Sequence, residues 1–195
     1  EADESMLHEN DAARILCDIC KNTMMDESSV KEGKIELAAA ADGLFKVDSA
    51  RLRLVNSFGQ MMIATRHGNT PVKKGDKLCG TRIIPLVIEK EKMQRVSELC
   101  GDEPLLQLLP YQIKKAAVLA TGSEVFHGRI KDTFTLVLEE KLAEFNVEVV
   151  YKQVLDDKPE QITAAIKTAI EEKGAEMVLC TGGMSVDPDD RTPLA

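Results

Sequence analysis

The stretch Ala116-Ala117-Val118-Leu119-Ala120-Thr121-Gly122-Ser123-Glu124 decides the fold of the second part of this chain. Its first five residues form a continuous apolar run, which is typical of a strand that is covered on both faces. Two more strand-like runs follow, at 147–151 and 177–180, and a segment with helical periodicity precedes each. The resulting β-α-β-α-β order, with short connections, predicts a parallel sheet with right-handed crossovers.

The two helical segments carry recognisable start and stop signals. In the first, Asp132 stands in a capping position, and apolar residues recur behind it at helical spacing as far as Phe145. In the second, Pro159 falls in the first turn, where its missing N–H costs little, and Gly174 follows the expected end. These signals support the α/β alternation.

Residues 1–112 have a different sequence pattern, with short strand-like runs and many turn-forming residues. A helix is expected near the start, followed by short strand-like runs at 43–47, 61–65 and 83–88. Turn-forming residues at 67–71 and 73–76 separate these runs. A helical piece at 89–99 and an apolar, packed connector at 105–110 complete this part. We therefore expect a smaller mixed α+β, β-rich accessory domain at 1–112 and an α/β domain at 113–195.

Composition limits the classes of function. The chain has 195 residues, and its 25 basic and 33 acidic residues give a net charge of −8, which disfavours a nucleic-acid binder. No apolar run approaches the roughly 18 residues of a membrane helix, so no membrane partner is expected. Five cysteines cannot all pair with one another and no signal peptide is evident, so we expect a cytoplasmic protein with reduced thiols. The acidic start without methionine fits a fragment or a processed chain.

An isolated CxxC motif, Cys17 and Cys20, lies on the first expected helix. A structural zinc site needs about four ligands, and the sequence offers neither a second CxxC nor a close histidine pair. Buried thiols on a helix face are therefore favoured over a metal site. For His127, a surface position in a loop is favoured over a catalytic role.

Three polar loops fall at the carboxyl ends of the predicted parallel strands, where ligands of such sheets bind. They lie at 121–132, 154–157 and 181–193. Paired glycines after a strand let backbone N–H groups approach an anion, and Thr181 and Ser185 add hydroxyl groups. The acidic residues of these loops could hold Mg²⁺ against a bound phosphate or cap the following helices. Both readings stay open for Asp187 and Asp189, whereas a functional role is favoured for Asp156 and Asp190.

Taken in order, the motifs TGSE, GRIKD, LDD and TGGMSVDPDDRTP resemble one family, the molybdopterin-binding domain. This domain is shared by molybdopterin adenylyltransferases, molybdopterin molybdotransferases and competence/damage-type proteins. The resemblance spans about residues 113–195. It implies a three-layer α/β/α parallel-sheet domain, incomplete in this chain, that holds the phosphate and dithiolene of the cofactor at the Gly-Gly loop.

The resemblance also implies the site. It makes Asp156 and Asp190 the functionally important acids, which we expect to be catalytic and, because Mg²⁺ prefers carboxylate oxygens, to be ligands of Mg²⁺. It implies molybdopterin or the molybdenum cofactor as the ligand, and a homo-oligomer or a molybdoenzyme partner. The implied cofactor-binding residues are Thr121, Gly122, Ser123, Glu124, Asp132, Thr181, Gly182, Gly183 and Ser185.

Departures from the family pattern leave three functions open. Phe134 replaces a frequent asparagine, the chain ends at Ala195 before the later half of the family's domain, and the part before Ile113 does not match the molybdotransferases. The first function is an enzyme of molybdenum cofactor biosynthesis that resembles the adenylyltransferases or molybdotransferases. The second is a cofactor-binding or sensing module, which the unmatched first part favours. The third is a nucleotide hydrolase like the competence/damage-type relatives.

Overall fold

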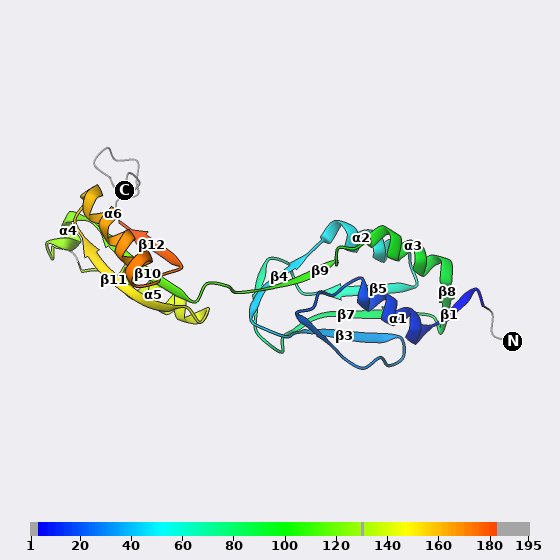
Figure 1. The fold of residues 1–195 in the computed structure, drawn as a ribbon. Helices are drawn as coiled ribbons and strands as arrows, with labels where there is room; N and C mark the ends of the chain where they lie inside the picture. The colour runs from blue at the N-terminus through cyan, green and yellow to red at the C-terminus, as the bar shows by residue number, and fades with distance from the viewer. Residues whose placement is uncertain (1–3, 130, 183–195) are drawn as a thin grey trace. The chain divides into compact units, whose positions relative to one another are not determined.

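The computed structural model describes residues 4–129 and 131–182. It divides the chain into two compact units, Glu1–Tyr111 and Gln112–Ala195 (Figure 1). The first unit is the longer one within this chain. Along the described residues, no helix combines the length and the apolar character needed to cross a membrane.

The second unit is built on a parallel sheet, as the sequence predicts. Its strands are β10 (Lys115–Thr121), β11 (Glu148–Leu155) and β12 (Met177–Thr181), in the order β11-β10-β12. Ala116 is in register with Val149 on one side and with Met177 on the other. From β10 the chain runs to β11 on one side of it and then crosses to β12 on its other side. The direction of winding therefore reverses between β10 and β12.

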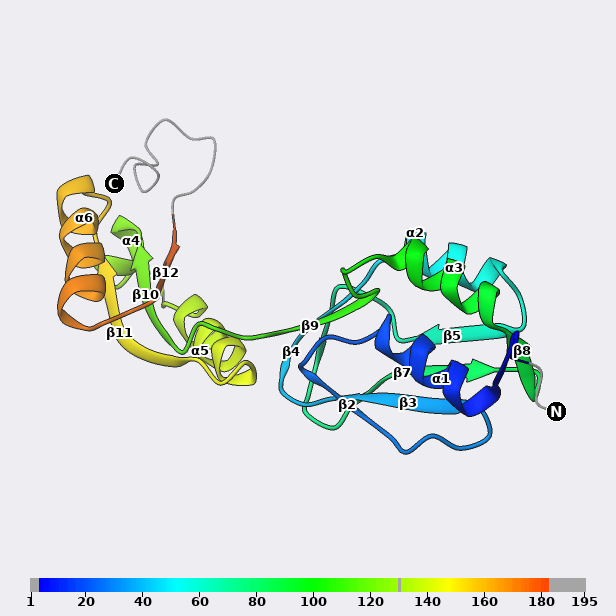
Figure 2. The ribbon, with the colours of Figure 1, turned by 45° about the vertical axis from the view of Figure 1, so that its right-hand side comes forward.

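Helices cover both faces of this sheet, which gives the predicted three layers (Figure 2). Successive side chains of β10 point to opposite faces. On one face, Ala116 and Val118 pack with Leu142 of α5 (Phe134–Glu144). On the other, Leu119 packs with Ile162 of α6 (Pro159–Lys167), and the π-helical turn η1 (Thr168–Glu172) continues that layer. A short helix, α4 (Ser123–Phe126), follows β10 directly.

Both predicted helix starts are confirmed. Asp132 Oδ1 accepts a hydrogen bond from the backbone N–H of Thr135, at 3.1 Å, in the first turn of α5. Pro159 occupies the first turn of α6, where no helical hydrogen bond is lost. The helices are thus fixed by the residues that the sequence singles out.

The first unit is mixed α+β and rich in antiparallel strands, as predicted. A four-stranded sheet has the order β2-β3-β7-β5, a three-stranded sheet the order β6-β4-β9, and β1 pairs with β8. The helices are α1 (Glu9–Asp18), α2 (Ser49–Ser57) and α3 (Lys90–Cys100). The strands are β1 (Met6–His8), β2 (Met25–Glu27), β3 (Lys34–Ala39), β4 (Gly43–Val47), β5 (Met61–Thr65), β6 (Thr70–Val72), β7 (Lys77–Ile83), β8 (Val87–Glu89) and β9 (Leu106–Pro110).

The four-stranded sheet of the first unit has one covered and one open face. Leu16 of α1 and Ile35 and Leu37 of β3 belong to one continuous apolar core. The intervening residues of β3, Lys34 and Glu36, are exposed and half-buried respectively, because alternate side chains of a strand point to opposite faces. The side of β3 away from the core is therefore charged.

The structure corrects three expectations for the first unit. The run at 83–88 is not one strand: β7 ends at Ile83 and β8 begins at Val87, with Pro85, which has no N–H to donate, between them. The connector at 105–110 is largely a strand, β9, which pairs with β4. The helix α2 has no counterpart among the expectations, because Val55 is its one buried residue and no apolar stripe marks it.

Four of the five cysteines are buried in the first unit, which agrees with the expectation of structural thiols: Cys17, Cys20, Cys79 and Cys100. Burial, together with Glu27, raises the pKa of the Cys17 thiol to about 12, although Lys21 opposes the shift. The Cys17 thiol donates a hydrogen bond to Glu27 Oε2, with 3.6 Å between the two atoms. Among the described residues, no three His, Cys, Asp or Glu side chains converge as a metal site would require.

We predict that one thiol, Cys180, reacts with a disulfide reagent at pH 8 before the other four, because it is half-buried and they are buried, although burial also raises the pKa of Cys180 and slows its reaction. The four buried thiols should react after denaturation. Counting the thiolate released from the native and the urea-unfolded chain measures both classes. Cys180→Ser should abolish the fast phase, and fast reaction of a second thiol in that variant would contradict the prediction.

The raised pKa of Cys17 also predicts a pH dependence of stability. An unfolded thiol ionises near its ordinary value of 9, whereas folded Cys17 stays protonated up to about 12. Between these values the folded state holds the extra proton, so the free energy of unfolding should fall as the pH rises above 9. Urea unfolding at pH 8 and pH 10 measures the loss, and Cys17→Ala should reduce it.

Candidate functional site

Two strand ends meet at the point where the sheet of the second unit reverses its winding. Thr121, at the end of β10, is buried, and its Oγ1 donates a hydrogen bond to the carbonyl oxygen of Thr181 in β12, at 3.0 Å. Gly182 follows with a φ of +134°, and a Cβ there would stand 2.0 Å from the carbonyl oxygen of Thr121. The predicted gathering of Thr121 and Gly182 at one end of the sheet is confirmed. A glycine is required for this approach.

The loop after β10 is tied to the loop after β11. The backbone N–H of Gly122, which has a φ of +142°, donates to the carbonyl oxygen of Leu155 at 3.1 Å. The next N–H, that of Ser123, donates to Asp157 Oδ2 at 3.0 Å. The carboxyl ends of the three strands therefore share hydrogen bonds around β10, and we call the region formed by 121–123, 155–157 and 181–182 the crevice.

The carboxylate of Asp156 already has partners within its own turn. Its Oδ1 accepts a hydrogen bond from the backbone N–H of Asp157 at 3.0 Å, and its Oδ2 lies 3.4 Å from Lys158 Nζ. Burial raises the pKa of Asp156, but these two partners and the charge of His127 outweigh burial, so the pKa is lowered. Asp156 is thus an ionised carboxylate that Lys158 already compensates.

Asp157 is the carboxylate with an unused acceptor. Its Oδ2 accepts from Ser123, whereas its Oδ1 is buried and has no hydrogen-bond partner within the described part of the chain. A buried polar atom without a partner is costly, so such an atom in a crevice marks a place where a ligand donor or a cation would bind. Asp157 is the second acid of the LDD motif, to which the family resemblance gives no separate role. The pair itself is the signal that could have found it.

The other described candidates, Glu124, His127 and Asp132, are exposed or already hydrogen-bonded. His127 and Glu124 are exposed, and His127 Nδ1 lies 2.7 Å from the carbonyl oxygen of Ser123 in its own helical turn. The Asp132 carboxylate is taken up by the N–H and hydroxyl of Thr135. Asp132 also borders a shallow hollow between α5 and β11, together with Leu136 and Val154. These contacts make Asp132 a helix cap.

Three predicted site residues, Gly183, Ser185 and Asp190, lie outside the described residues. Of the others, the structure brings together Thr121, Gly122, Ser123, Asp156, Thr181 and Gly182, and it adds Asp157. Within the described ranges, no convergent set of His, Cys, Asp or Glu side chains could hold a metal ion by itself. The assignment of Mg²⁺ to Asp156 and Asp190 stays a prediction.

Comparison with protein families agrees with the resemblance of the motifs. Residues 117–195 match the family described as "Probable molybdopterin binding domain". The match spans 79 of the 195 residues, so it characterises the second unit and leaves the first unit without an assignment.

Curated relatives share the same part of the chain. A protein of Bacillus velezensis named "Putative competence-damage inducible protein" is 34% identical over 79 residues, which is 40% of this chain and 18% of the relative. A CinA-like protein of Fervidobacterium nodosum is 36% identical over 80 residues, 41% of this chain and 19% of the relative. The aligned part is thus less than a fifth of the length of these relatives.

Among solved structures, the molybdopterin biosynthesis enzyme MoaB of Thermus thermophilus is 28% identical. The alignment covers 42% of this chain and 52% of that one, with a TM-score of 0.40.

We predict that Gly182→Ala destabilises the second unit more than Gly128→Ala does. Both glycines have positive φ, but a Cβ at Gly128 meets nothing within 4 Å, whereas at Gly182 it meets the backbone of Thr121. The forced shift should cost about 1–3 kcal/mol beyond the strain shared by both variants. Thermal unfolding of the two variants measures the difference, and equal losses of stability would show that the close approach does not constrain the fold.

Proposed function

We propose that the second unit, which carries a domain of the molybdopterin-binding family, binds molybdopterin or the molybdenum cofactor at the crevice. The observation that carries this proposal is the unpartnered, buried Oδ1 of Asp157 beside the Thr121–Gly182 contact. The reversal point of a parallel sheet is where such folds bind ligands, and these residues supply the polar groups there. The family match to residues 117–195 supports a pterin as the ligand.

The chemistry of the described crevice suits the ring of a pterin. A carboxylate oxygen without a partner accepts an N–H, and the amino-pyrimidine edge of a pterin presents such donors. The Thr121 hydroxyl is held by Thr181, so its position is fixed before a ligand arrives. We assign the ligand's phosphate to the Gly182–Gly183 loop, as the resemblance implies, with Asp190 as the acid of that loop.

The role in molybdenum cofactor biosynthesis or handling follows from the ligand, and one incubation separates the candidates. The intact chain is mixed with molybdopterin, Mg-ATP and molybdate. Adenylylated pterin or inserted metal would identify an assembly enzyme, and binding without turnover would identify a binding or sensing module. A homo-oligomer or a molybdoenzyme remains the proposed partner.

A second candidate is a nucleotide hydrolase of the competence/damage type. It is favoured by the relatives named as competence-damage inducible and CinA-like proteins. Hydrolysis of a pyridine nucleotide by the chain, without measurable affinity for molybdopterin, would select this function over the first.

We predict that Asp157→Asn weakens molybdopterin binding about tenfold or more, because it removes a charged acceptor from the crevice. Asp156→Asn is the matched control, since the Asp156 carboxylate already bonds Asp157 N–H and Lys158. It should change the affinity less than about twofold, within the range of surface ion pairs. Calorimetric titration of the three proteins measures the affinities, with thermal unfolding as the check of folding. Equal weakening by both variants would contradict the role of Asp157.

Asp190→Asn tests the carboxylate implied by the resemblance. If Asp190 holds Mg²⁺ against the ligand, the variant should lose the Mg²⁺-dependent part of binding or turnover and keep its affinity for free molybdopterin. If Asp190 is a helix cap, asparagine should replace it without effect, because the two residues cap about equally well. Titration with and without Mg²⁺ distinguishes these outcomes, and unchanged Mg²⁺ dependence and turnover would remove Asp190 from the site.

A further inference from the structure

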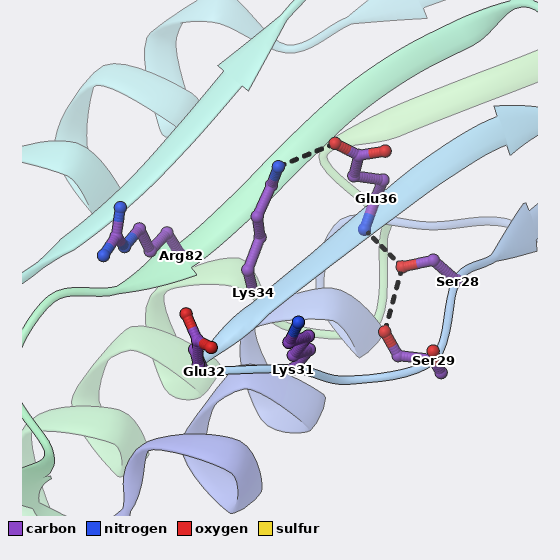
Figure 3. Close-up of a pocket in the computed structure, with 7 residues that line it drawn as sticks. All are labelled: Ser28, Ser29, Lys31, Glu32, Lys34, Glu36 and Arg82. Carbon is purple, nitrogen blue, oxygen red and sulfur yellow. Dashed lines mark hydrogen bonds and ion pairs between the residues drawn. The ribbon is translucent and has the colours of Figure 1, made fainter.

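A second hollow lies in the first unit, on the charged side of β3 (Figure 3). Its volume is about 370 Å³, and it is bordered by the segment that joins β2 to β3 and by the neighbouring strand β7. Three cations, Lys31, Lys34 and Arg82, and two carboxylates, Glu32 and Glu36, line it, so the charged lining has one excess positive charge. The chain as a whole carries a net charge of −8, so the local excess of positive charge is opposite in sign to the charge of the whole chain.

Two of these cations oppose each other directly. Lys34 of β3 and Arg82 of β7 are register partners in an antiparallel pair, and both are exposed. Like charges at directly opposed positions of a sheet are destabilising. A bound anion between or beside them would turn this repulsion into attraction.

One of the two carboxylates that line the hollow, Glu36, is already paired with lysines. Glu36 Oε1 lies 2.7 Å from Lys34 Nζ, and Glu36 Oε2 lies 3.0 Å from Lys77 Nζ. Lys34 and Lys77 lower the pKa of Glu36 to about 2, so Glu36 is ionised near neutral pH. Figure 3 shows Lys34 turned towards Glu36 and the guanidinium of Arg82 turned away from it. Within the described residues, Arg82 forms no ion pair, so its planar set of donors is available.

The border of the hollow is built rigidly. Lys31 and Lys34 exchange two backbone hydrogen bonds across a tight turn, in which Glu32 and Gly33 have φ values of 50° and 66°. The Gly33 N–H donates to Asn10 Oδ1 at 3.0 Å, which fixes the turn to α1. A ligand at a preformed border loses little affinity to ordering of the chain.

We propose that this hollow binds the oxyanion group of a small molecule, a phosphate or a carboxylate. Arg82 is the principal donor, and the ammonium groups of Lys31 and Lys34 line the same hollow. A guanidinium matches the paired oxygens of either group, and such charge-assisted hydrogen bonds are about twice as strong as neutral ones. The hollow belongs to the first unit, so this inference does not depend on pterin binding by the second.

The test is a titration of the full chain with inorganic phosphate and, separately, with acetate. Sodium chloride keeps the ionic strength constant, and the backbone amide NMR signals of Lys31, Glu32, Lys34 and Arg82 report binding. We expect saturable shifts of these signals. Arg82→Gln should weaken the affinity about tenfold or more, because a charge-assisted hydrogen bond is lost. Arg53→Gln is the matched control, because Arg53 is exposed on α2 and does not line the hollow.

The two titrations distinguish the chemical class of the bound anion. Saturation by phosphate alone assigns the site to a phosphoryl group, and saturation by both anions extends it to carboxylates. The absence of saturable shifts with either anion, or equal affinities in Arg82→Gln and Arg53→Gln, would overturn the proposal. Loss of the register repulsion should leave Arg82→Gln at least as stable as the parent chain, so a folding defect would not imitate the expected result.

Discussion

The second unit depends on the burial of one strand on both faces. Ala116, Ala117, Val118 and Leu119 of β10 are fully buried, because a strand with apolar side chains pointing both ways needs a cover on each side. Helix α5 supplies one cover, and α6 with η1 supplies the other. This requirement places β10 at the centre of the sheet, between β11 and β12. Its carboxyl end is therefore the one place where loops from both neighbours can meet.

The crevice follows from that central position. The loop after β10 reaches β11 through the bond from Gly122 N–H to the Leu155 carbonyl oxygen, and it reaches β12 through the bond from Thr121 to Thr181. Gly182 then lies so close to Thr121 that a side chain cannot be accommodated. The hydrogen bond from Ser123 N–H orients Asp157 and leaves the second oxygen of its carboxylate without a partner. The backbone thus presents the candidate ligand-binding atom.

Local signals in the sequence were sufficient for the sheet, its helix starts and the strands at 43–47 and 61–65, because each depends on side chains near in sequence. Helix α2 could not be predicted from periodicity, since its one buried residue leaves no stripe. Strand β11 runs to Leu155, beyond the predicted 151, because Lys152 and Gln153 are exposed and lack the apolar signal. Asp156 and Asp157 are adjacent and chemically identical. Only the conformation of their turn determines which of them accepts the hydrogen bond from Ser123. The sequence carries no local sign of this difference, because the direction of each side chain is set by contacts with another loop.

The two proposed sites would hold an anionic group by different physical means. The described part of the crevice contains two carboxylates, Asp156 and Asp157, and the Lys158 ammonium is already paired with Asp156. The N–H groups of Gly122 and Ser123 and the Thr121 hydroxyl already have acceptors there. We therefore assign the anionic group of a ligand to backbone N–H groups of the Gly182–Gly183 loop, whose hydrogen bonds depend on geometry and little on salt. In the hollow beside Arg82, exposed cations would supply the attraction, and added salt screens exposed charges. Binding at the crevice should consequently persist at ionic strengths that remove binding at the hollow, so the salt dependence of a ligand's affinity tells which unit holds it.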